Sequence, residues 1–148
     1  MIIETLKTLF SRDIQKLKYE IEQYQNEENL WLTDAQISNC AGNLCLHLLG
    51  NLNYYIGNGL AKTGYIRERD LEFSQKNVPR AELLQKIEAV QKVVNQGLDG
   101  LSMDDLKSDF PIQIWEKPTE MEYTLVHLLT HLSYHLGQIN YHRRLLDS

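Results

Sequence analysis

Residues 119–142 read TEMEYTLVHLLTHLSYHLGQINYH, and this stretch guides the interpretation of the whole chain. Its leucines and isoleucine recur at three- and four-residue spacing, which predicts a helix with one apolar face. His127, His131 and His135 follow one another at every fourth residue of that helix. Side chains at this spacing lie on one side of a helix, close enough for two imidazoles to bind the same divalent ion.

Helix boundaries are predicted from the residues that flank the periodic segments. Thr119 and Glu122 match a capping box at the start of the last helix. A first helix is predicted from Leu6 to about residues 27–29. A second runs from Ile37 to about residues 63–64, where glycine suits a helix end. Pro79 suits the first turn of a third helix, which continues to residue 98.

Four amphipathic helices without a persuasive run of strands predict an all-α fold, and the simplest architecture is a four-helix bundle. The 148 residues suffice for a single domain over residues 1–148. The connections at 64–78 and 99–118 are longer than usual for neighbouring bundle helices, which permits a crossover topology. Residues 99–118 include Phe110 and Trp115, so we expect this connection to pack against the helices, or to form a lid or a partner interface.

The composition excludes several classes of protein. A formal net charge of −5 and a pI near 5.5, without a local basic patch, argue against a nucleic-acid partner. No apolar run approaches the 18 or so residues of a membrane span, and residues 1–7 do not resemble a signal peptide. Cys40 and Cys45 lie about 140° apart on a helix, so they predict neither a disulfide nor a cysteine zinc site. We therefore expect a cytoplasmic protein with free thiols.

Polar side chains form a stripe beside the apolar face of two helices. On the last helix the stripe comprises the histidines and Gln138, and on the second helix it comprises Cys40, Asn43, His47, Asn51, Tyr54 and Asn58. Buried imidazoles need partners, and a shared metal ion would supply one for His47 and a pair from the last helix. Plain core histidines are the alternative. Spacing alone leaves the pair open between His127/His131 and His131/His135.

The string HLSYHLGQI at residues 131–139, together with LCLHLLGN at residues 44–51, resembles the DinB/YfiT superfamily of metal-dependent enzymes. The resemblance extends over essentially the whole chain, including RERDLEF at 67–73 and VPRAEL at 78–83. It implies a four-helix bundle, often a homodimer, that holds a divalent metal through His47, His131 and His135. His127 then becomes a neighbour of the site. Tyr134 and Leu136 stand where many relatives have a histidine and an arginine.

A site with three histidine nitrogens leaves a coordination position open for water or substrate, as in catalytic zinc centres. Such a site suits zinc, nickel or iron. The resemblance implies that it acts on a small molecule, either as a hydrolase or in transfer of a low-molecular-weight thiol. No glutamate lies between His131 and His135 to act as a base. Asn51, Gln138 and Tyr54 are candidates to orient ligands or substrate, or simply to satisfy buried polar groups and pack. The alternative function is a non-catalytic, metal-stabilised bundle that serves as a dimeric interaction module.

Overall fold

The computed structural model describes residues 1–148 and is all-helical, as predicted. Its α-helices are α1 (Ile2–Glu22), α2 (Ala41–Leu52), α3 (Arg69–Ser74), α4 (Arg80–Asp99) and α5 (Met121–Leu146). Two short 3-10 helices, η1 (Glu27–Trp31) and η3 (Asp105–Lys107), and a π-helical turn, η2 (Asn53–Asn58), complete the elements. Extended pairing is limited to two isolated bridges. None of the helices combines the length and the apolar character needed to cross a membrane.

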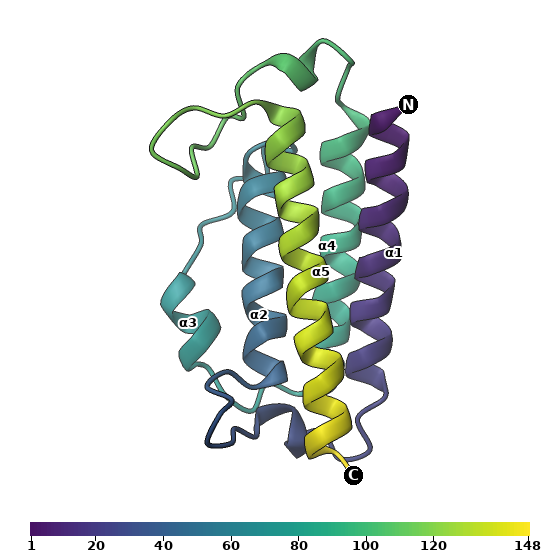
Figure 1. Ribbon diagram of the computed structural model, residues 1–148, viewed down its shortest axis with the longest axis vertical. Helices are drawn as coiled ribbons and strands as arrows, with labels where there is room; N and C mark the ends of the chain where they lie inside the picture. The colour runs from purple at the N-terminus through teal and green to yellow at the C-terminus, as the bar shows by residue number, and fades with distance from the viewer.

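Helices α1, α2, α4 and α5 lie lengthwise beside one another (Figure 1). Both α1 and α2 contact α4 and α5, so α1 and α2 occupy opposite corners of the arrangement. In Figure 1, α1 and α5 run downwards, whereas α2 and α4 run upwards. Because α2 and α4 are parallel, the connection between them must return along their length. That connection carries the short helix α3, which packs against α2.

One cluster of 30 buried apolar residues fills the space between the long helices. Helix α1 contributes side chains at three- and four-residue intervals, and α4 does the same through Leu83, Ile87, Val90 and Val94. Burying one such side chain stabilises the fold by about 1.5–3 kcal/mol relative to leaving it exposed. Every residue of α2 is buried, because α3, α4 and α5 all pack on it. Polar groups on α2 therefore require partners inside the protein.

The apolar connection at residues 99–118 packs against the helices. Phe110 is buried in the core cluster, and Ile112 and Ile114 pack on that cluster's surface. Two backbone hydrogen bonds hold the connection against the start of α5, from Phe110 N to Thr119 O and from Met121 N to Ser108 O. This part of the connection therefore packs against the helices, at the end that carries the N-terminus (Figure 1).

The capping box predicted at the start of the last helix is wrong. Helix α5 begins at Met121 after Glu120, and no side chain caps it. Thr119 does not cap the helix, because its backbone pairs with Phe110 and its hydroxyl donates a hydrogen bond to Lys117 O. The extended pairing of residues 108–110 with 119–121 thus prevents the capping box.

Three other predicted boundaries are corrected. Helix α1 stops at Glu22, because the Asp147 carboxylate accepts hydrogen bonds from the backbone N–H groups of Gln25 and Asn26. Helix α2 begins at Ala41 rather than near Ile37, since Asp34 and Ile37 exchange backbone hydrogen bonds in a tight turn. The second helical segment, α2 with η2, ends at Asn58, short of the predicted residues 63–64.

Candidate metal centre

Three histidines from two helices meet between α2 and α5. His47 lies at the middle of α2 and is 5% exposed, while His131 and His135 lie one turn apart on α5. Each offers a ring nitrogen, and these nitrogens all lie within 4.8 Å of one another. The Nε2 atoms of His47 and His131 are 3.1 Å apart. The fold therefore joins His47 to the His131/His135 pair rather than to the His127/His131 pair.

Two of the three imidazoles are oriented by oxygen acceptors at Nδ1. The Glu72 carboxylate accepts a hydrogen bond from His47 Nδ1 at 3.0 Å, and Gln138 Oε1 accepts one from His135 Nδ1 at 2.7 Å. A proton on Nδ1 leaves Nε2 with a free lone pair, which is the form that binds a metal. His131 Nδ1 is buried without a partner. The arrangement thus directs ring nitrogens of three histidines toward one point.

Glu72 was not anticipated from the sequence. It lies on α3, is 6% exposed, and accepts hydrogen bonds from Arg67 Nε at 2.9 Å and from Arg67 Nη2 at 3.0 Å. Burial alone would raise the pKa of Glu72, but the bonds from His47 and Arg67 outweigh it and hold the pKa below its ordinary value. A charged carboxylate therefore links Arg67 to His47.

The backbone of α2 leaves room for this carboxylate at Gly50. A Cβ atom at Gly50 would overlap the Glu72 carboxylate. Asn43 fixes the other end of α3, because its Nδ2 donates hydrogen bonds to the carbonyl oxygens of Glu72 and Gln75. Helix α2 thus positions the residue that in turn orients His47.

Burial lowers the pKa of both candidate ligands on α5, His131 and His135. It is the largest cause that lowers the pKa of His131, which reaches about 3 with the help of the neighbouring His135 and His47. Burial also lowers the pKa of His135, partly offset by its bond to Gln138. Since a metal binds only the unprotonated imidazole, these residues are available as ligands at neutral pH.

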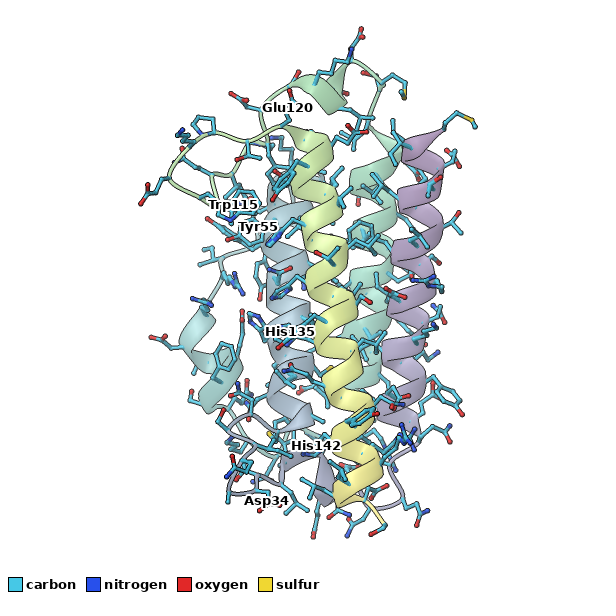
Figure 2. All side chains as sticks on the ribbon, in the orientation of Figure 1. Asp34, Tyr55, Trp115, Glu120, His135 and His142 are labelled. Carbon is cyan, nitrogen blue, oxygen red and sulfur yellow. The ribbon has the colours of Figure 1, made fainter.

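A cavity of about 320 Å³ opens beside the cluster. Its wall combines residues of α2, α3, α5 and the two long connections, and no aspartate or glutamate is among them: His47, Asn51, Tyr55, Arg67, Arg69, Ile114, His127, Leu128 and His131. Figure 2 shows Tyr55 and Trp115 nearer than His135 to the end of the helices that carries the N-terminus. A small molecule in this cavity would face the histidine nitrogens.

The residues expected to assist the ligands have different positions. Gln138 contacts His135, and Asn51 lines the cavity. Tyr54 does not line the cavity, and Tyr55 does. Both tyrosines lie in the π-helical turn, in which Gly59 N bonds to Tyr54 O five residues earlier. Tyr55 is four residues after Asn51, so the two side chains lie on the same side of this helical segment, toward the cavity.

The remaining histidines lie outside the cluster. His127 lines the cavity, and its ring packs on Trp115 with the centroids 4.8 Å apart. His142 is buried toward the other end of α5, below His135 in Figure 2. Its Nδ1 bonds to the Tyr24 hydroxyl, and its Nε2 bonds to Leu32 O. His142 is therefore a core residue with both nitrogens satisfied.

This donor set fits a divalent metal ion. Three imidazole ligands suit zinc, nickel or iron, and a carboxylate bonded to the second nitrogen, as Glu72 is to His47, is common around metal-bound histidines.

The sequence matches the family described as "Protein of unknown function (DUF1572)" over residues 2–148. The chain belongs to this family. A search of curated proteins finds no match. The family description names no function, and the histidine cluster is the feature of this chain that indicates one.

Proposed function

We propose that this DUF1572 chain is a four-helix bundle of the DinB/YfiT type that binds one divalent metal through His47, His131 and His135. In this proposal it is a metal-dependent enzyme for a small molecule. The carrying observation is the convergence of three ring nitrogens beside a cavity of about 320 Å³. Three protein ligands leave one coordination position for water or substrate, whereas structural zinc sites are usually closed by four.

Transfer of a low-molecular-weight thiol is favoured over hydrolysis. Hydrolysis normally needs a general base near the attacking water. The cavity wall contains no carboxylate, and its one histidine outside the proposed ligand set, His127, packs on Trp115. Glu72 is already bonded to His47 and Arg67. A bound metal would lower the pKa of a thiol directly, so thiol transfer does not require a separate base.

The thiol must come from the substrate. Cys40 and Cys45 are both fully buried, and neither lines the cavity. Burial raises the pKa of the Cys45 thiol to about 12, so it stays protonated. A cofactor-like small thiol and an electrophile are therefore the reactants that suit this cavity.

Elemental analysis and activity assays test the proposal together. Freshly purified wild type and the variants His47→Ala, His131→Ala, His135→Ala and His127→Ala are compared for bound metal and for thiol consumption with an electrophile. We expect the first three variants to lose both metal and activity, and His127→Ala to keep its metal. Equal metal retention in all four variants would contradict the site. A metal-loaded wild type that is inactive with panels of thiols and esters would contradict the enzyme.

The alternative is a non-catalytic, metal-stabilised module that acts as a homodimer. It is favoured by large exposed side chains on α5, namely Tyr123, Tyr134, Tyr141 and Leu145, each about 60% exposed or more. A second copy would bury these side chains. Loss of metal would then lower the melting temperature and the dimer fraction, measured by calorimetry and light scattering, while activity stays undetectable throughout.

A further inference from the structure

The cavity beside the histidines has a charge opposite to that of the chain. The whole protein has a formal net charge of −5, yet the only formally charged residues in the cavity wall are Arg67 and Arg69. Neutral side chains form the remainder of the wall. An acidic protein thus presents a positively charged cavity next to its candidate metal centre.

Arg67 is paired with an acidic residue, whereas Arg69 is not. Arg67 bonds through Nε and Nη2 to Glu72, and its guanidinium lies over the Tyr55 ring at 5.9 Å from the centroid. Its position is fixed, and its Nη1 is not used by Glu72. Arg69 is exposed and forms no ion pair. The cavity wall therefore has one uncompensated guanidinium.

Asn51 indicates a second feature of the ligand. Its side chain lines the same cavity and is only 7% exposed, yet its Oδ1 atom has no hydrogen-bond partner. A buried carbonyl oxygen without a partner costs free energy, and a donor from a ligand would remove that cost. The wall thus offers an acceptor at Asn51 and cationic donors at the arginines.

We propose, on the basis of the proposed function, that the substrate is a small anionic molecule. Its carboxylate or phosphate group lies against Arg69 and the free edge of Arg67, and a hydroxyl or N–H group donates to Asn51. Guanidinium groups bind carboxylate and phosphate through paired N–H donors, which fixes the orientation of the ligand as well as attracting it. The uncharged end of the molecule then points to His47 and His131.

The test is an NMR titration with inorganic phosphate and, separately, with acetate, followed through the Asn51 side-chain amide. Metal-free wild type, Arg69→Gln and Arg144→Gln are compared at low ionic strength. Arg144 is the matched control, because it is exposed at the far end of α5. We expect one or both anions to bind wild type and Arg144→Gln equally, and Arg69→Gln to bind about tenfold more weakly.

A second comparison distinguishes anion binding by the arginines from anion binding by a metal ion. His135→Ala, expected to lack metal, removes a side chain that does not line the cavity, so it should bind the anion as metal-free wild type does. Absence of binding to the metal-free wild type, equal affinity in Arg69→Gln, or binding that occurs only with metal present would each overturn the anion site. Metal retention in the histidine variants would instead contradict the proposed function, so the two failures are distinguishable.

Discussion

The substitution Glu72→Gln probes the contact that orients His47. It keeps the size of the side chain but removes the charge that binds Arg67. The Glu72 and Arg67 side chains are 7% and 11% exposed, so water cannot replace the lost interaction fully. The carboxylate accepts bonds from His47 and from two nitrogens of Arg67, and glutamine retains only one acceptor oxygen.

The expected cost follows from these contacts. Hydrogen bonds to charged groups contribute about 1.5–3 kcal/mol each, and removing one partner of a buried pair leaves the other uncompensated. Relief of the desolvation of the carboxylate offsets part of the loss. We therefore expect the free energy of unfolding to fall by about 2–4 kcal/mol, which lowers the melting temperature by roughly 5–15 °C for a chain of this length.

Metal affinity should fall as well, by about 10–100-fold, because a partner that orients a ligand is lost. The assay is a competition titration with a chelator, beside thermal unfolding of the metal-free protein. Glu68→Gln is the matched control, since Glu68 is exposed in the same segment and makes no side-chain bond to the histidines. Wild-type metal affinity in Glu72→Gln would refute the orienting role of Glu72.

Two further predictions concern space and protonation. Gly50→Ala should weaken metal binding by displacing the Glu72 carboxylate. At the control position Gly137 an added Cβ meets nothing within 4 Å, so Gly137→Ala should leave metal binding unchanged and stabilise α5 by up to about 1 kcal/mol. Equal metal affinities of the two variants, measured by chelator competition, would contradict this prediction. Burial lowers the pKa of His142 from 6.5, so as the pH falls the unfolded chain takes up a proton before the folded protein does. The free energy of unfolding should therefore fall below about pH 6.5, by up to about 1.4 kcal/mol per pH unit. Urea unfolding should show a flatter pH dependence in His142→Gln, and an unchanged slope would count against this assignment.

The helical character of the chain could be predicted because apolar periodicity reports directly on burial. The long helices α1, α4 and α5 have this periodicity throughout. Their ends were less predictable, since distant residues determine them. Asp147 ends α1 through backbone N–H groups near residue 25, and Ser108 pairs with the start of α5. No local pattern contains such long-range contacts.

The candidate site was predicted only in part for a similar reason. Helical spacing placed three histidines on one side of α5 but could not select a pair, and the choice came from the resemblance. Glu72 was missed because α3 has six residues, too few to show a period, and its partner His47 is 25 residues away. No local pattern indicates it, because the acid is buried while its apolar neighbour Leu71 is exposed.

The π-helical turn after α2 has an evolutionary consequence. A single extra residue in a helix rotates all later side chains while leaving their identities unchanged. A relative without that residue would direct the same side chains to other positions around the helix, with no substitution at all. Among DUF1572 chains, we therefore expect a one-residue gap after Asn53 to alter the cavity wall that Tyr55 lines, rather than to be a neutral difference in length.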